Sequence, residues 1–458
     1  MSSQPIVDEA GDKQMMDDNN NSNNNNDNNN NNNNEQVDDD FQFDFDDTTN
    51  TNKLYADKVK YRAYLDTIFP WDILYEWLTA SHSSRGEDEV VYFSKREFSV
   101  SSKGINYKTG KEQEFWNRHK SFTNIEELKP FAMGRIDEVR QKADVPEKLD
   151  IGAVYNHEPS RMGAFMDYRP VCRELVFDID SNDYDEVRTC CKGNTLCPKC
   201  WRLLAAAIRM LQVGLRDSFG FEHFMPIFSG GRGVHLWVCD PNAMMMTEDM
   251  RRAVLGYFRL SDQSPVSPDD MHPIAKDLFD NIFLPLFQDH LLEDQQILSD
   301  DKQIEAIRSI MPATFKIKTG DAKKKVEFSP RDIINQILDK SSLTVQEKWK
   351  SIYDTFDKNS AFELIYKIVI HFSAPRLDEA VTVGVNHLLK SPFCIHPRTR
   401  IRLCVPISLK EIETFNPDTV PTLEQLTENP TIINKFRSIF KNFVNNLRNQ
   451  QKMDTDAF

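Results

Sequence analysis

The sequence predicts an α+β protein, a mixed α/β core interrupted by a helical insertion. Short apolar runs of strand length recur before residue 240, and segments with helical spacing lie between them. From about residue 261 to 374 the strand patterns nearly vanish, and helix-like segments follow one another until the mixed pattern resumes near Pro375. At 458 residues the chain is long enough for more than one domain and a large core.

Residues 1–52 differ in composition from the rest. They are rich in asparagine and hold 13 acidic residues and one lysine, so most of the net charge of −15 lies there. Such a segment cannot bury enough apolar surface to offset its ordering entropy, and we expect a disordered Asn/Asp-rich leader. The alternative is that its acidic stretch with Phe41, Phe43 and Phe45 docks on a basic partner. The remaining chain is close to neutral, which leaves a nucleic-acid partner open.

The sequence lacks the marks of a membrane or secreted protein. It has no run of eighteen apolar residues. Its N-terminus shows no basic-then-apolar signal pattern, so we expect no membrane association. Eight cysteines in so long a chain, four of them clustered, argue against a disulfide framework and for a reducing intracellular compartment.

The secondary structure expected before residue 261 alternates between helices and strands. Pro70 breaks the first helical pattern, and Gly220 is a plausible helix stop. Turn chemistry at 230–233 predicts a hairpin. In chain order we expect helices at 54–69 and 73–77, strands at 90–93, 96–100, 151–155 and 175–180, a helix at 203–215 and hairpin strands at 225–229 and 234–239. In the insertion we expect helices at 278–292, 303–310, 333–338 and 362–372.

Two carboxylates lie in the strand at 175–180. Leu175, Val176, Phe177 and Ile179 are apolar, as in a strand covered on both faces. Side chains at i and i+2 of a strand share a face, so Asp178 and Asp180 project side by side. An exposed strand end or a helix cap is the alternative, but like charges in an apolar strand need a counter-charge. We therefore predict a catalytic metal site, with Mg²⁺ or Mn²⁺ preferred over Zn²⁺.

Four cysteines follow within eleven residues. Cys197-Pro-Lys-Cys200 is a zinc half-site, and Cys190-Cys191 supplies a second pair. Adjacent ligands are less usual than a second C-x-x-C, and free thiols or a redox dithiol are the alternatives. With four thiolates the zinc site would be closed, and therefore structural.

Two further segments carry polar chemistry. Phe228-Ser-Gly-Gly-Arg-Gly-Val-His235 offers backbone N–H groups, a hydroxyl, a guanidinium and an imidazole, which suits a phosphate. A plain glycine hairpin fits about equally well, and the segment is neither a P-loop nor a dinucleotide fingerprint. Pro375-Arg-Leu-Asp378, with Lys390 and His396 downstream, places cations near an acid, but a surface ion pair between Asp378 and Arg376 is the stronger explanation from the residues alone.

Together these motifs resemble the small catalytic subunit of archaeo-eukaryotic DNA primase. The resemblance runs in matching order from about residue 53 to Pro406. It rests on Arg173–Asp180, Asp183–Arg188, the cysteine set ending in Trp201, Ser229–His235, and Pro375–Asp378 with Asn386–Phe393. It implies a catalytic core around a small antiparallel sheet at 53–260 with a zinc motif at 190–200, a helical insertion at 261–374, and a second core part with a C-terminal helix at 375–458.

The resemblance also implies an activity and the residues that perform it. The activity is template-directed synthesis of short RNA primers from ribonucleoside triphosphates on single-stranded DNA, by two-metal nucleotidyl transfer. The roles that it implies are catalytic Mg²⁺ or Mn²⁺ ligands at Asp178, Asp180 and Asp378, nucleotide contacts at Glu97, Arg118, Ser229, Arg232, His235, Lys390 and His396, and structural Zn²⁺ ligands at Cys190, Cys191, Cys197 and Cys200. The Glu97 and Arg118 matches rest on shorter motifs.

Partners and location follow from the resemblance as well. It implies a primase large subunit, the DNA polymerase alpha complex and a nuclear location. Many relatives carry two adjacent arginines where this chain has Gly231-Arg232, so one guanidinium is missing and nucleotide binding should be weaker or use another cation. Two alternatives remain: a gap-filling or damage-bypass polymerase of the same superfamily, and a zinc-stabilised assembly protein whose carboxylates are relics.

Overall fold

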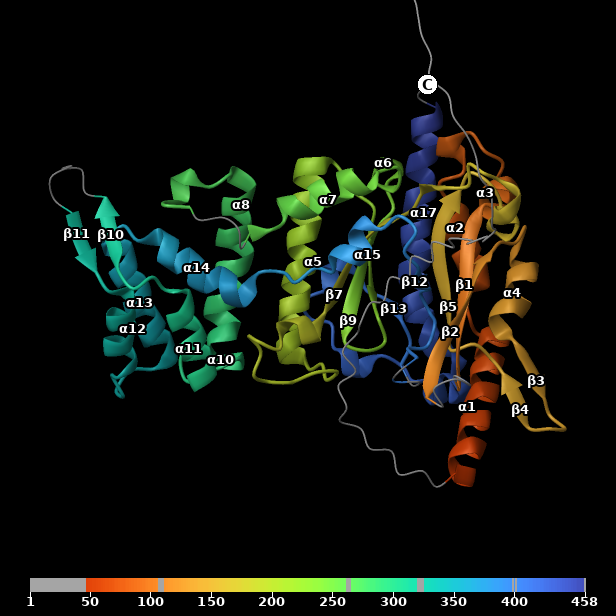
Figure 1. Cartoon of the computed structure of the whole chain (residues 1–458), viewed down its shortest axis with the longest axis horizontal. Coiled ribbons are helices and arrows are strands. Elements are labelled where there is room, and N and C mark those ends of the chain that lie inside the picture. The colour runs from red at the N-terminus through yellow and green to blue at the C-terminus, as the bar shows by residue number, and fades with distance from the viewer. Residues whose placement is uncertain are drawn as a thin grey trace, which may run out of the picture. The chain divides into compact units, whose positions relative to one another are not determined.

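The computed structural model describes residues 47–105, 111–260, 265–318, 325–397, 399 and 402–456 (Figure 1). The chain separates into one unit of Met1–Asn50 and one of Thr51–Phe458. Residues 1–46 of the predicted leader lie outside the described residues, and its last residues begin helix α1, Asp47–Thr67. No helix in the described part is long and apolar enough to cross a membrane.

Three helices precede the first strand. α1 ends at Thr67 and α2 spans Trp71–Thr79, which confirms the predicted break near Pro70. α3 spans Glu89–Ser94, so the strand predicted at 90–93 is wrong. Asp88 caps α3, because its carboxylate accepts hydrogen bonds from the N–H groups of Val90 and Val91. Both valines are exposed, so their β-branched side chains would bury no surface in a strand. The Asp88 cap therefore decides for the helix.

Five antiparallel strands form one sheet. Their order is β12-β5-β1-β2, and β6 pairs with β5. The predicted strands at 96–100 and 151–155 fall inside it. Its strands are β1 Arg96–Ile105, β2 Glu112–Lys120, β5 Lys148–Tyr155, β6 Pro170–Cys172 and β12 Leu389–Lys390. Between β2 and β5 lie α4 Ile125–Met133 and the hairpin of β3 Arg135–Asp137 and β4 Lys142–Asp144.

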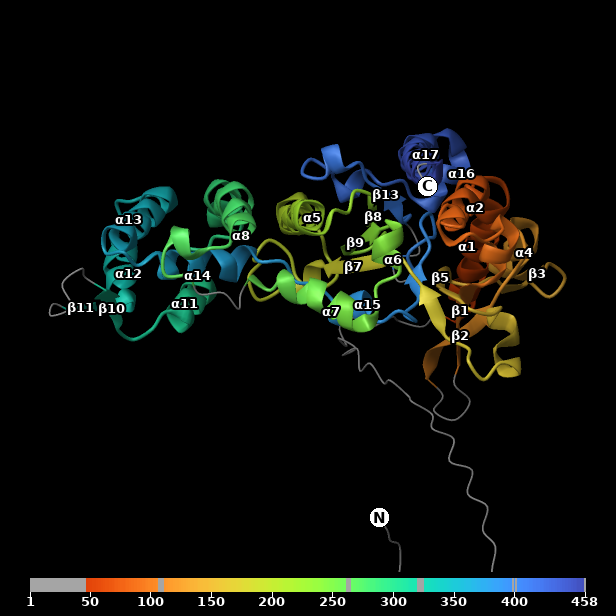
Figure 2. The same ribbon diagram turned by 90° about the horizontal axis from the view of Figure 1, so that it is seen from above.

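A second antiparallel sheet has the order β13-β8-β9-β7. Its strands are β7 Leu175–Asp180, β8 Phe224–Phe228, β9 Gly233–Val238 and β13 Val405–Pro406, and they confirm the predicted carboxylate strand and hairpin. Helix α5, Pro198–Phe219, packs against β7 and β9 (Figure 2). It ends as predicted at Gly220, whose φ of 71° is the left-handed conformation that glycine adopts without strain.

The interval 261–374 is mostly helical in its described residues (Figure 1). The four predicted helices are present, and the first is continuous but contains two π-helical stretches. Its elements are α8 Pro273–Leu278, π-helical Phe279–Phe283, α9 Leu284–Leu286, π-helical Phe287–Leu291, α10 Leu292–Asp294, α11 Asp301–Ile310, α12 Pro330–Leu338, α13 Val345–Lys358 and α14 Phe362–Ser373. The hairpin of β10 Phe315–Lys318 and β11 Lys325–Phe328 and helix α13 were not predicted.

Short helices flank the second sheet, and a long one ends the described chain. They are α6 Pro241–Met244, α7 Glu248–Tyr257, α15 Glu379–Val383, α16 Leu423–Glu428 and α17 Asn434–Asp456, which contacts α2. The mixed class with antiparallel sheets is therefore confirmed.

A buried ion pair joins the two sheets. Arg96 begins β1, and Glu174 immediately precedes β7. The guanidinium donates two hydrogen bonds to the carboxylate, at 3.0 and 2.9 Å, and a third to the Gly152 carbonyl at 3.1 Å. The exposed fractions of the two side chains are 1% and 3%. Two parallel N–H···O bonds fix geometry as well as charge, so this pair sets how the sheets meet.

Candidate active site and metal centre

The predicted carboxylate pair lies on β7, at the edge of the second sheet. Asp178 pairs with His235 of β9, and Asp180 pairs with Gly233. The Asp178 side chain is 19% exposed and lies 3.4 Å from Nε2 of His235. Paired residues of neighbouring strands share a face. Asp178 and His235 therefore lie together on the face away from the apolar Phe177.

Asp378 joins this pair from a distant part of the chain. Its backbone N–H donates to the carbonyl of Asp178 at 3.1 Å, which ties the start of α15 to β7. Its Oδ1 caps α15 by accepting from the N–H groups of Ala380 and Val381, at 2.8 and 3.2 Å. The structure thus brings together the three acids that the sequence motifs predict.

Asp178 is surrounded by more negative than positive charge. Burial, followed by the charges of Asp180 and Asp378, raises its pKa well above the usual value, while Lys390 acts in the opposite direction. Its Oδ1 has no hydrogen-bond partner among the described residues. A buried carboxylate oxygen that accepts no hydrogen bond, beside two further acids, fits a divalent cation with oxygen ligands.

The three acids are not drawn into one tight cluster. Within the described ranges, only the four cysteines form a group of three or more ligand atoms that all lie within 4.8 Å of one another. Asp180 accepts a hydrogen bond from Nε of Arg232 at 2.9 Å, and Asp378 is engaged with α15. These contacts hold the two outer carboxylates.

The loop between β8 and β9 is built around Ser229. Its hydroxyl accepts from the N–H groups of Gly231 and Gly233 at 3.4 and 3.1 Å, so the hydroxyl lies inside the loop. A side chain at Gly233 would place Cβ 2.1 Å from Oδ1 of Asp180. Only glycine therefore lets the loop approach the carboxylate. The loop ends beside the acids, where its backbone and Arg232 present donors.

Two predicted contacts reach the site from the end of the core. Lys390, on β12, is in register with Asp150 of β5. His396 lies against the loop, because a Cβ at Gly231 would be 2.7 Å from its Nε2. Burial, then the charges of Lys390 and Lys148, lowers the pKa of His235 to about 3, so its imidazole is neutral near pH 7.

Glu97 and Arg118 form a second polar cluster on the five-stranded sheet. Arg118 donates from Nε and an Nη to the two oxygens of Glu97, at 3.1 and 3.3 Å, and the buried carboxylate also accepts from the Tyr155 hydroxyl at 3.0 Å. Arg118 further donates to the Asn386 carbonyl at 3.1 Å, which ties the cluster to the segment before Lys390. In the described part of the chain, no hydrogen bond or ion pair joins Glu97 or Arg118 to the three acids.

Sequence reasoning missed two groups near the site. Asp150 is buried, with its pKa raised first by burial and lowered in part by Lys148, 3.2 Å away, and by Lys390. Asp183 follows β7, and burial, then the charge of Asp180, raises its pKa. The signal for Asp150 was an acid inside the apolar run 149–155, one residue before the predicted strand began.

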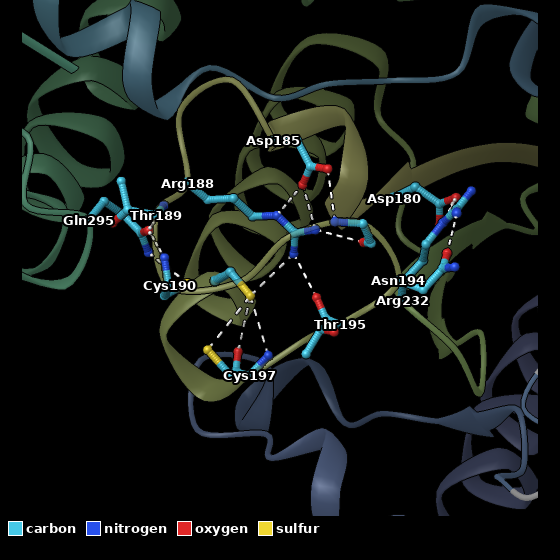
Figure 3. Close-up of polar contacts among 12 residues, drawn as sticks. Asp180, Asp185, Arg188, Thr189, Cys190, Asn194, Thr195, Cys197, Arg232 and Gln295 are labelled. Atoms are coloured by element: carbon cyan, nitrogen blue, oxygen red, sulfur yellow. Dashed lines mark hydrogen bonds and ion pairs between the residues drawn. The ribbon is translucent and has the colours of Figure 1, made fainter. Parts of the chain in front are cut away.

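The four cysteines meet at the N-terminus of α5, and Figure 3 shows Cys190 and Cys197 among them. Sγ of Cys197 and Cys200 lie 3.8 Å apart. Gln295 of the helical interval accepts from the N–H groups of Thr189 and Cys190, at 2.8 and 3.2 Å. A hydrogen bond from Cys190, then the Cys197 backbone and Arg188, lower the pKa of Cys200 to about 5 despite burial. Four converging thiols of which one is readily ionised suit a zinc ion.

The cysteine loop also contacts the carboxylate site. Asn194 Oδ1 accepts a hydrogen bond from Arg232 at 2.6 Å, and Arg232 in turn donates to Asp180 (Figure 3). The loop itself is held by Arg188, which donates to Asp185 at 2.6 Å and to the Thr195 carbonyl at 2.8 Å. A closed metal site here would therefore fix Asn194, the partner of the arginine that binds Asp180.

Comparison with known proteins agrees with this geometry. The family described as DNA primase small subunit matches residues 177–409. The DNA primase small subunit of Drosophila melanogaster is 33% identical over 377 residues, covering 79% of this chain and 79% of that protein. That of Saccharomyces cerevisiae is 30% identical over 428 residues, covering 86% and 94%. The polymerase domain of Mycobacterium tuberculosis Ligase D in complex with DNA is 12% identical and covers 84% and 96%, but its TM-score of 0.30 does not establish a common fold.

Two antiparallel sheets, two acids on an edge strand with a third hydrogen-bonded to it, and a cluster of four cysteines define a mixed α/β protein with a candidate carboxylate site and a candidate metal site. The chain belongs to the DNA primase small subunit family and is of the eukaryotic type.

Proposed function

We propose that this chain is the catalytic subunit of a DNA primase, a DNA-directed RNA polymerase that makes short RNA primers from ribonucleoside triphosphates on single-stranded DNA. The observation that carries the proposal is the buried Asp178 carboxylate, whose Oδ1 accepts no hydrogen bond from the described residues and which lies beside Asp180 and Asp378. Family membership supports the same activity.

The proposed chemistry is two-metal nucleotidyl transfer. Asp178, Asp180 and Asp378 would hold Mg²⁺ or Mn²⁺, which when bound lowers the pKa of an attacking 3′-hydroxyl and offsets the charge of the leaving pyrophosphate. Arg232 holds the Asp180 carboxylate in place at 2.9 Å. His235, neutral at pH 7, lies next to Asp178 without adding a positive charge there.

The remaining site residues would bind nucleotide. The Ser229 hydroxyl accepts two loop amides, so its own proton is free to be donated to a phosphate oxygen. Lys390, Arg232 and His396 lie around the same loop and would meet the triphosphate. Glu97 and Arg118 would form a second contact on the other sheet. Zn²⁺ at the four cysteines would be structural.

The domain division is part of the proposal. We assign a leader at 1–52, a core at 53–260 and 375–458, and a helical insertion at 261–374. The partners would be a single-stranded DNA template, a primase large subunit and the DNA polymerase alpha complex, and the location would be the nucleus. The near-neutral charge of the folded part supports dependence on a partner for template grip.

The test is primer synthesis on unprimed single-stranded DNA with labelled ribonucleotides and Mg²⁺ or Mn²⁺. We expect short RNA from the wild type and from Asp249→Ala, an exposed acid on α7, and none from Asp178→Ala or Asp178→Asn. Product from both Asp178 variants would refute the proposed centre. Extension of an annealed primer without synthesis from two ribonucleotides would instead indicate a gap-filling polymerase.

A further inference from the structure

Trp116 is the single exposed tryptophan of this chain. It lies on β2, an edge strand of the five-stranded sheet, and 53% of its surface is exposed. The chain has six tryptophans, all at described positions. The other five are buried, at Trp71, Trp77, Trp201, Trp237 and Trp349, with exposures between 1% and 7%. A half-exposed indole on a sheet edge is a large apolar surface without a cover.

The strand register shows which face of the sheet carries Trp116. Trp116 is paired with Ser101 of β1, and Ser101 is paired with Lys148 of β5. Cross-strand partners share a face, and so do residues two apart on one strand. Trp116 therefore lies on the face of Lys148 and Asp150, and of Lys390, which pairs with Asp150. The neighbouring Phe115, 46% exposed, pairs with Ser102 and lies on the opposite face.

This shared face points toward the carboxylate centre. Arg118 of β2 donates to the Asn386 carbonyl at 3.1 Å, and Asn386 lies in the segment that joins α15, capped by Asp378, to Lys390 of β12. Arg118 follows Trp116 by two residues and binds Glu97 of β1 with 37% of its side chain exposed. The face thus carries a cation beside the aromatic ring, the pairing with which proteins hold single-stranded nucleic acid.

We propose that Trp116 is a stacking platform for a base of the single-stranded DNA template. The proposal rests on the proposed function, because it assigns a path for the template that the carboxylate centre copies. Every base has a π face, so one indole can hold a template without regard to its sequence. That property suits an enzyme that must start on many templates.

Distance favours the template over the incoming nucleotide. Three strand spacings of about 4.8 Å separate β12 from β2, which puts Trp116 on the order of 14 Å from Lys390. That is the length of about four stacked nucleotides at roughly 3.4 Å each. A nucleotide bound between the Ser229 loop and Lys390 does not span this gap, whereas a strand running across the face does.

The experiment measures binding of oligothymidylate to the full chain at low salt, by fluorescence anisotropy and by protection of tryptophan emission from iodide. We expect Trp116→Ala to weaken binding by about ten-fold. Trp116→Phe should retain most affinity, and Phe115→Ala should bind as the wild type. The dependence of affinity on salt should not change in Trp116→Ala, because no phosphate-binding cation is removed. Oligothymidylate should protect the iodide-accessible emission of the wild type, which comes from Trp116.

Three outcomes would overturn the platform. One is equal affinity of Trp116→Ala and wild type for oligothymidylate, or no protection of the Trp116 emission from iodide by oligothymidylate. That result would indicate that this face binds a protein partner instead. Another is equal loss in Trp116→Ala and Phe115→Ala, which would indicate damage to β2. The third is normal DNA binding with a raised KM for ribonucleotide. Asp178→Ala should bind DNA normally and make no primer. DNA binding therefore tests the stacking platform, and primer synthesis by the Asp178 variant tests the proposed catalysis.

Discussion

The buried pair of Arg96 and Glu174 provides the sharpest stability prediction. The Glu174 carboxylate is the counter-charge of Arg96, and it also acts on two further buried guanidinium groups, those of Arg173 and Arg251. Arg96→Met removes one of three cations around one acid. Glu174→Gln removes the acid and leaves three cations close together. The two substitutions should therefore differ in cost, although they break the same ion pair.

The magnitudes follow from burial. Breaking a buried pair by removing one partner costs about 3–5 kcal/mol, since an uncompensated charge stays in a low-dielectric site. Arg96→Met should lie near the lower limit, about 3 kcal/mol, because Glu174 keeps two other cations. Glu174→Gln should cost about 5 kcal/mol or prevent folding. The Arg259 and Glu379 pair is as short, at 2.7 Å, but its side chains are 51% and 43% exposed. Arg259→Met should therefore cost below about 1 kcal/mol.

Urea unfolding at constant pH, followed by tryptophan fluorescence, measures these differences as shifts in midpoint. The reasoning is refuted if Arg96→Met destabilises more than Glu174→Gln, or if the exposed control costs as much as either. Primer synthesis adds a second readout. The pair joins β1 to the start of β7, so Arg96→Met should lower activity more than Arg259→Met even under conditions where both are folded.

Three further outcomes are expected. Gly233→Ala should reduce primer synthesis by at least about a hundred-fold, because its Cβ would lie 2.1 Å from the Asp180 carboxylate. At Gly256 an added Cβ meets nothing within 4 Å, so Gly256→Ala should leave synthesis unchanged. Steady-state assays of both variants measure the difference. Asn194→Ala should lower kcat several-fold, because it removes a hydrogen-bond partner of Arg232, which holds Asp180. Metal analysis should find the same zinc content as in the wild type. An unchanged kcat would show that the cysteine loop does not affect the carboxylate site. Burial, then nearby cations, lowers the pKa of His387 to about 4. The unfolded chain then binds a proton that the folded chain does not, so stability should fall as pH drops from about 6.5 to 4. His387→Gln should make the fall in thermal midpoint across that window smaller, with the remainder due to His235.

Much of the site could be predicted because its chemistry is local in the sequence. The strand with Asp178 and Asp180, the hairpin that follows and the cysteine set each lie within a short stretch, and alternation alone places both acids on one face. Asp378 is different. Its position depends on one backbone hydrogen bond to Asp178. In the sequence, an acid two residues after Arg376 is what a surface ion pair would also show. The motif resemblance identified it, and physical reasoning from the residues did not.

The errors in secondary structure have local causes as well. Val90 and Val91 have strand propensity, yet the Asp88 cap and exposure on one side decide for helix. The hairpin within the helical interval has lysine-rich strands, which hide the apolar alternation that predicts a strand. Asp150 escaped notice because its role depends on Lys148 and on a strand from the end of the core, and neither pairing can be read from spacing along the chain.

The backbone bond between Asp378 and Asp178 also bears on how the protein is made. Both sheets receive their final strand from the stretch 389–406, and the third acid arrives only shortly before it. At a synthesis rate of about 5–20 residues per second, a nascent chain carries its first two acids for about 10–40 s before the third emerges. Neither sheet is complete in that interval, and the third carboxylate is absent. On the proposed function, a chain cut short by premature termination before Asp378 should make no primer, whatever fraction of it folds.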